Sequence, residues 1–179
     1  MPEDTLLQKA GNGLLFNLSW LAIVTSQSLL IAPLVVAAHV TIHQLWIGRG
    51  VRELQFIAGC ALFGLLLDQL LFALGVFTLD GQKSLAPLWL TCLWPVLATT
   101  FDHAFVSLQR QLTLAGILGG IGGIMSYYAG TSMSAVEFAD PVYGPAIIGA
   151  LWAALFPAMA AIAHLWFREE DNGGEAHLA

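Results

Sequence analysis

The sequence predicts an all-α protein, a polytopic membrane bundle of six transmembrane helices with both termini in the cytoplasm. Hydrophobic residues make up 58% of the 179 residues and charged residues only 10%, whereas soluble domains carry about 25% charged residues. The mean hydropathy is +0.76. The apolar runs leave no room for a separate soluble domain, so we expect one integral membrane domain over residues 1–179.

The first three predicted spans follow from apolar runs of the length that a bilayer requires, about 20 residues. The first run lies near 13–29, and the acidic segment before it is unlike the basic start of a signal peptide. Pro33 opens the second run, near 31–48, where a missing N–H costs least. A Gly-Arg-Gly turn then leads to the third run, near 54–78.

The last three predicted spans are bounded by polar turns. Pro87 precedes the fourth run, near 88–109, and Gln-Arg-Gln makes a tight turn into the fifth, near 112–130. A longer loop containing Asp140 leads to the sixth, near 143–167. Residues 1–11 and 168–179 are then expected to be soluble tails.

The distribution of basic residues predicts the orientation. With six spans, five basic residues lie on the side of the termini: Lys9, Arg49, Arg52, Arg110 and Arg168. Lys83 is alone on the other side. Because cytoplasmic loops carry an excess of Lys and Arg, we expect a multi-pass membrane protein with both termini in the cytoplasm.

Charge and motifs exclude several classes of function. The net charge of −6 argues against nucleic acid as a partner, which would require a basic patch. The sequence has no phosphate-binding loop, nucleophile elbow or metalloprotease motif, so no cofactor is expected. Cys60 and Cys92 lie on different runs at different depths, and we expect two buried thiols.

Asp68 is the strongest candidate for a functional residue. It lies in the third run, where a carboxylate costs at least about 2.5–3.5 kcal/mol on insertion scales. Gly64 and Gly75 share its helical face, which indicates that this face points into the bundle. Asp68 is either an acid/base or ligand-binding group, or a carboxyl that fastens helices together through Gln27 or a tyrosine.

The helical rise sorts the polar residues into two layers. Asp68 lies about 21 Å from the cytoplasmic boundary, level with Gln27, Trp94, Tyr127 and Tyr128. An inner layer lies about 5–14 Å from that boundary, and it contains Asn17, His39, His43, Asp102, His103 and His164. The layers are about 10 Å apart, too far for one catalytic pair unless the helices tilt.

The inner layer contains the weak metal-ligand candidates His39 and His43. They are four residues apart and so share a helical face, and another His or Asp could complete a zinc site. No third ligand is fixed by spacing, and histidines that bridge helices explain the pair as well. No metal is therefore predicted.

A run of glycines in the fifth predicted span contains two overlapping GxxxG spacings, Gly116/Gly120 and Gly119/Gly123. Such spacings let helices approach closely. We expect a helix-packing face there, and it is the candidate surface for a homodimer. A hinge or a groove for lipid is the alternative interpretation.

Over most of its length the chain resembles a bacterial family of small integral membrane proteins that is classed as a domain of unknown function. The pattern is Leu-Leu-Leu-Asp ending at Asp68, Leu-Trp at 93–94 with Ala-Thr-Thr at 98–100 and His103, and Tyr-Tyr-Ala-Gly at 127–130. Members are often encoded beside enzymes that resemble cyclopropane-fatty-acid synthases. The resemblance implies a bacterial inner-membrane protein linked to lipid modification or to membrane stress.

Three hypotheses for function follow. The first is a lipid-handling protein with a polar pocket around Asp68; as an enzyme it would use Asp68, Asp102 and His103 for acid/base chemistry. Its candidate binding residues are Asn17, Trp20, Gln27, Trp94, Tyr127 and Tyr128. The second is a non-catalytic membrane scaffold for a lipid-modifying enzyme, and the third is a small proton- or cation-coupled transporter. Membrane lipids are the expected partners in the first.

Overall fold

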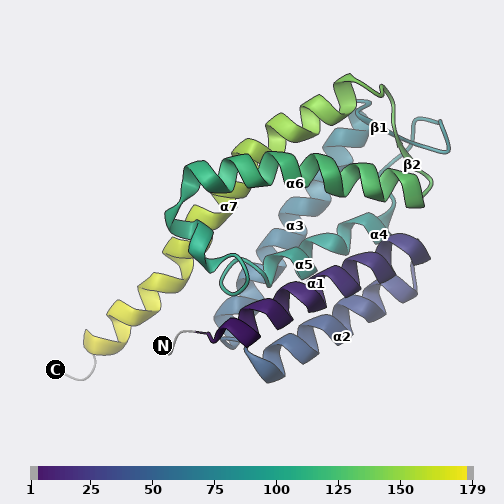
Figure 1. Cartoon of the computed structure of the whole chain (residues 1–179). Helices are drawn as coiled ribbons and strands as arrows, with labels where there is room; N and C mark the ends of the chain where they lie inside the picture. The colour runs from purple at the N-terminus through teal and green to yellow at the C-terminus, as the bar shows by residue number, and fades with distance from the viewer. Residues whose placement is uncertain (1–3, 177–179) are drawn as a thin grey trace.

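The computed structural model describes residues 4–176, and it is built from helices with one small sheet (Figure 1). The elements are α1 (Leu6–Ser26), α2 (Ile31–Trp46), α3 (Val51–Ala73), β1 (Phe77–Leu79), α4 (Leu88–Thr91), α5 (Leu93–Ala98), the 3-10 helix η1 (Val106–Arg110), α6 (Leu112–Met133), β2 (Val136–Phe138) and α7 (Tyr143–Ala176). The predicted helical class is confirmed, and the paired strands are an addition to it.

The helices form two packed pairs around a central group. α1 lies beside α2, α6 lies along α7, and α3 and α5 pack against each other between the pairs (Figure 1). β1 and β2 pair antiparallel, with Thr78 opposite Glu137. The start of α1 and the end of α7 lie at the opposite end of the bundle from this sheet (Figure 1).

Local hydrogen bonds fix the two ends of α1. Thr5 and Gln8 form a capping box at its start, which satisfies two otherwise unpaired N–H groups. At its end, Gln27 adopts a left-handed conformation. The Gln27 side chain donates to the Met133 carbonyl (3.2 Å) and accepts from the Ala135 N–H (2.9 Å). The end of α1 is thereby fastened to the end of α6.

The fourth apolar run differs from the expected continuous helix over 88–109. Helix α5 ends at Ala98, and an irregular turn leads to η1. The hydroxyls of Thr99 and Thr100 donate back to the carbonyls of Val96 (2.8 Å) and Leu97 (2.6 Å). Such bonds compete with helical ones.

Among the described residues, three helices are long and apolar enough to cross a membrane: α3, α6 and the part of α7 from Tyr143 to Arg168. α2 and the segment Leu88–Ala98 are apolar but shorter. α1 is long, but it carries several polar residues along its first half. Six full spans are therefore not confirmed, although the chain has the helices of a membrane protein.

The structure differs from a soluble protein in its exposed apolar side chains and its buried charged ones. Large apolar side chains are exposed on α1, α2 and α3, among them Leu6 (84% exposed), Leu45 (83%) and Leu66 (63%). Polar side chains such as Glu53 and Asp68 are 1% exposed. Extended exposed apolar surface marks contact with a membrane or a partner, and buried polar groups survive when they are hydrogen-bonded.

The glycine run of α6 packs inside the chain. Cβ atoms built at Gly119 and Gly123 would lie 2.4 Å from Phe156 and 2.6 Å from Trp152, and at Gly120 3.1 Å from the Gly149 carbonyl. The predicted close helix packing is present, and its partner is α7. The face proposed for a homodimer is therefore covered by the same chain.

Candidate functional site

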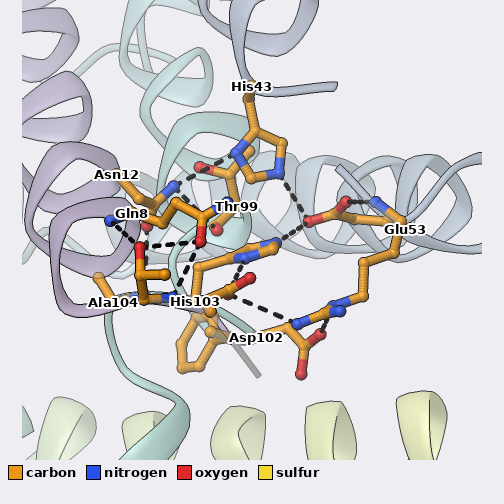
Figure 2. Close-up of polar contacts among 12 residues, drawn as sticks. Gln8, Asn12, His43, Glu53, Thr99, Asp102, His103 and Ala104 are labelled. Atoms are coloured by element: carbon orange, nitrogen blue, oxygen red, sulfur yellow. Dashed lines mark hydrogen bonds and ion pairs between the residues drawn. The ribbon is translucent and has the colours of Figure 1, made fainter. Parts of the chain in front are cut away.

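Glu53 is the centre of a buried polar cluster that joins α1, α2, α3 and the turn after α5 (Figure 2). Its Oε1 atom accepts hydrogen bonds from Nε2 of His43 (2.7 Å) and Nε2 of His103 (3.0 Å). Its Oε2 atom accepts from the Gln44 side chain (3.0 Å) and from the backbone N–H of Arg49 (2.7 Å). The side chains of Glu53, His43 and His103 are at most 1% exposed. Four donors thus hold one buried carboxylate.

Asn12 fixes the tautomer of His43. The Asn12 Oδ1 atom accepts from the Ala104 N–H, and its Nδ2 atom donates to the Thr99 carbonyl, both at 3.3 Å. These two backbone groups determine which way the amide faces. Its remaining N–H meets Nδ1 of His43 at 3.3 Å, so this nitrogen accepts, and the His43 proton lies on Nε2, toward Glu53.

His103 has a carboxylate at each ring nitrogen. Nε2 faces Glu53, and Nδ1 lies 2.6 Å from Oδ2 of Asp4. Because carboxylate oxygens only accept, both nitrogens donate, and the ring is an imidazolium. Burial lowers the pKa of His103, but the hydrogen bonds and charges of Glu53 and Asp4 outweigh it and raise the pKa above the ordinary value. This stabilisation is fully present below about pH 6.5 and is lost as the pH rises through the raised pKa.

Asp102 belongs to the outer edge of the polar cluster. It pairs with the Arg49 guanidinium, which also lies 3.5 Å from Asp4. The Gln109 amide donates to the second oxygen of Asp102 (3.3 Å), and Gln109 also contacts Nδ1 of His164 (3.2 Å). Asp102 is therefore held by partners of its own.

His39 has partners separate from those of His43. Its Nδ1 lies 2.8 Å from the Ser19 hydroxyl, and its Nε2 lies 2.9 Å from the Thr99 hydroxyl. The Thr99 hydroxyl donates to the Val96 carbonyl, so it accepts from His39, and Nε2 of His39 carries a proton. His39 thus bridges α1, α2 and the end of α5.

His43, Glu53 and His103 are the described residues that could hold a metal ion, with their ligand atoms within 4.8 Å of one another. A metal on Nε2 of His43 would require the proton to lie on Nδ1. Nδ1 faces the N–H of Asn12, which is itself fixed by Ala104 and Thr99. The donor set therefore fits a network of ion pairs better than a metal centre.

A separate cavity of about 370 Å³ lies between α1 and α6, with α4, α5 and α7 on its inner side. Its walls are mainly aromatic and aliphatic, and on α6 they include Gly119, Gly122 and Gly123. The residues that give it chemical character are Trp20, Asp68, Trp94, Tyr127 and Trp152. Its volume falls within the range of ligand sites, about 300–1,000 Å³.

Asp68 reaches the cavity wall through an arrangement that depends on glycine. The Trp94 indole donates to Oδ2 of Asp68 at 3.0 Å. One turn earlier on α3, a Cβ atom at Gly64 would lie 2.0 Å from the Trp94 ring, so only glycine admits the indole there. The Trp94 ring also stacks on Trp152, with centroids 5.6 Å apart and planes at 15°. One carboxyl thereby fastens α5 to α3.

Gly64→Ala should destabilise the protein by about 1–3 kcal/mol, as overpacking does. The added methyl would displace the Trp94 ring and break its bond to Asp68. Gly59→Ala on the same helix is the matched control, because a Cβ there meets nothing within 4 Å. Unfolding in mixed micelles measures both, and equal stability of the two variants would contradict the arrangement.

The structure distributes the predicted site residues among three places. Trp20, Trp94 and Tyr127 line the cavity together with Asp68. Asp102 and His103 belong to the polar cluster and do not line the cavity. The other predicted binding residues do not line it: Asn17 bonds back to the Gly13 carbonyl, Gln27 ties α1 to α6, and Tyr128 packs on Phe138 at the surface.

Four important residues were not predicted: Asp4, Asn12, Glu53 and Trp152. Glu53 lies directly before the third predicted span, near 54–78, where a charged residue is common. The Gly-Arg-Gly turn, which returns the chain within a few residues, was the one signal that Glu53 faces His43. Nothing in the spacing of the sequence indicates that Asp4 reaches His103.

No curated protein and no solved structure matches this sequence. A family model described as "Protein of unknown function (DUF2878)" matches residues 9–158. The matched residues include Glu53, His43 and His103 of the polar cluster and the whole lining of the cavity. The chain therefore belongs to this family of unknown function.

Proposed function

We propose that the protein binds a membrane lipid in the cavity between α1 and α6, and that it takes part in lipid handling or modification at the bacterial inner membrane. The observation that carries the proposal is an apolar cavity with a single acidic side chain, Asp68, in its wall. A lipid tail would bury its apolar surface against the aromatic lining. Its polar end would lie near Asp68.

The open side of such a site should be the α6 wall. Gly122 lines the cavity, and a Cβ built there meets nothing within 4 Å. Helix α6 also exposes apolar side chains, including Ile117 (55%), Ile121 (54%) and Met125 (66%). A lipid tail beside α6 would therefore meet apolar surface from the bilayer to the cavity.

Within this proposal, Asp68 is the acid that contacts the ligand. Asp102 and His103 are bonded to Arg49, Asp4 and Glu53 instead. Chemistry that requires Asp68 and Asp102 together is therefore not favoured. The polar cluster would hold the ends of α1, α2 and α3 in place while the cavity binds lipid.

Gly122→Leu should reduce the lipid that copurifies with the protein by at least about tenfold, because the new side chain would occupy the space of the ligand. Gly59→Leu is the control: it adds the same side chain on α3, where a Cβ also meets nothing within 4 Å, and away from the cavity. Mass spectrometry of the detergent-purified proteins measures bound lipid. Equal lipid in all three proteins would contradict the proposal.

The cellular test compares membrane lipids of wild-type, deletion and Asp68→Asn strains. Asparagine keeps an oxygen that accepts the Trp94 N–H and removes only the acid, so the variant should fold. A changed lipid profile in both mutant strains supports a role in lipid modification. Identical profiles in all three strains would exclude that role.

A further inference from the structure

We infer that the ligand of the cavity is a lipid that carries a protonated amine, whose ammonium group pairs with Asp68 while its apolar chain lies along the cavity wall. This inference rests on the proposed function and specifies the charge of its ligand. It follows from the charges of the wall, from one oxygen atom of Asp68, and from the course of the cavity along α6.

The first observation is the charge of the cavity wall. Among the described residues that line the cavity, Asp68 is the one acid, and none is Lys, Arg or His. No ion pair between described residues includes Asp68. Asp68 is 1% exposed, and a buried carboxylate is costly unless an opposite charge and hydrogen bonds compensate it. The wall therefore favours a positively charged ligand over an anionic one.

The second observation is a carboxylate oxygen that faces the cavity. Oδ2 of Asp68 accepts from the Trp94 indole, and Oδ1 has no well-formed hydrogen bond among the described residues. Among those residues, the side-chain atoms that are both buried and unpaired are Oγ1 of Thr91 and Nε1 of Trp152. Oδ1 of Asp68 is not one of them, so it has accessible surface. The Thr91 hydroxyl interacts with Asp68 but brings no charge. One oxygen of Asp68 is thus within reach of a ligand.

The third observation is the course of the wall away from Asp68. The charge of Asp68 acts on the Tyr127 hydroxyl, so the two side chains lie near each other. From Tyr127 the wall extends along α6 to Leu118, about 13 Å by the helical rise. The α6 residues that line this stretch are glycines, apart from Ser126 beside Tyr127. The helix η1, which precedes α6, adds Leu108 to the lining. A chain that begins at Asp68 therefore has apolar wall to lie against.

A protonated amine meets these conditions better than the other common polar ends of lipids. An ammonium has three N–H donors, and a charge-assisted hydrogen bond to Oδ1 of Asp68 is stronger than a neutral one. A carboxylate or phosphate would place a second negative charge beside Asp68. A hydroxyl can donate to Asp68, but it leaves the charge uncompensated. The ligand has to reach only this one carboxyl group.

The experiment compares three ligands that share one tetradecyl chain: tetradecylamine, tetradecanol and tetradecanoate. The full-length protein is placed in phosphatidylcholine nanodiscs at about pH 7, where an alkylamine is protonated, as lysine is. Phosphatidylcholine has no N–H group that could compete for Asp68. Binding is followed by tryptophan fluorescence, because four tryptophans line the cavity: Trp20, Trp89, Trp94 and Trp152. Partition of each ligand into nanodiscs without the protein is measured separately and subtracted.

Tetradecylamine should bind at least about tenfold more tightly than tetradecanol or tetradecanoate, because it alone forms a charged hydrogen bond with Asp68. Asp68→Asn should remove this preference by weakening the binding of the amine, and it should leave the binding of the alcohol almost unchanged. Asparagine keeps an oxygen that accepts the Trp94 N–H. Melting temperatures in the same nanodiscs verify that each variant is folded.

The outcomes separate this inference from the proposed function. If the three ligands bind equally and Gly122→Leu abolishes their binding, the cavity takes lipid tails and the inference of an amine is wrong. Tightest binding of the alcohol or the carboxylate would also overturn it, as would an amine preference that survives in Asp68→Asn. If Gly122→Leu leaves the binding of all three ligands unchanged, the cavity is not the site, and the proposed function fails as well.

Discussion

Glu53→Gln is expected to destabilise the protein by about 3–5 kcal/mol, as when one partner of a buried ion pair is removed. Whichever way the new amide turns, its NH₂ group faces two donors. These are the ring N–H groups of His43 and His103 on one side, or Gln44 and the Arg49 N–H on the other. The imidazolium of His103 also loses one of its two carboxylates.

Unfolding of the variant in mixed micelles, followed by circular dichroism, measures this effect. Glu137→Gln is the control, because it makes the same chemical change on β2, where the side chain is exposed. Exposed substitutions of this kind usually stay within about 0.5 kcal/mol. If the two variants were equally stable, Glu53 could not be the centre of the polar cluster.

The second large effect is expected for Gly119→Ala, which should destabilise the pairing of α6 with α7 by about 3 kcal/mol or more, at or above the usual range for overpacking. The added Cβ would lie 2.4 Å from Cβ of Phe156 and 2.8 Å from the Trp152 carbonyl. The Trp152 carbonyl belongs to the backbone of α7, and Cβ of Phe156 is bonded directly to that backbone. Neither atom can move by a change of rotamer, so the clash is relieved only if α6 and α7 separate.

Gly122→Ala tests the same helix with the same substitution. Its Cβ meets nothing within 4 Å, and alanine is favoured over glycine within a helix by about 1 kcal/mol. This variant should match or exceed the wild-type protein in thermal stability. Loss of stability in both variants to the same degree would show that helix propensity or a membrane effect, and not contact with α7, governs these positions.

The run near 112–130 illustrates what can be predicted from sequence. Its length and apolarity predicted a spanning helix, and α6 covers Leu112–Met133. The glycine spacing predicted a close helix partner, and one is present. Which helix it would be could not be predicted, because a face of small residues is complementary to many helix surfaces.

The run near 88–109 shows where this reasoning fails. Its composition is that of a span, yet the helix ends at Ala98. The hydroxyls of Thr99 and Thr100 bond to their own backbone, and the next turn supplies His103 and the Ala104 N–H to the polar cluster. Hydropathy is averaged over a window of residues, so a few polar residues change it little. It therefore does not predict where tertiary hydrogen bonds end a helix.

By itself, the sequence determined the class of the protein, the approximate course of its helices and the separation of Asp68 from Asp102 and His103. These properties depend on the length of each apolar run and on the constant rise per residue of a helix. Both describe position along a helix axis. Only the tertiary structure decided that Asp68 binds Trp94, that His43 and His103 share Glu53, and that a cavity lies beside α6. Those pairings depend on how each helix is rotated and which neighbour it meets, and both are set by side-chain packing between segments far apart in the chain.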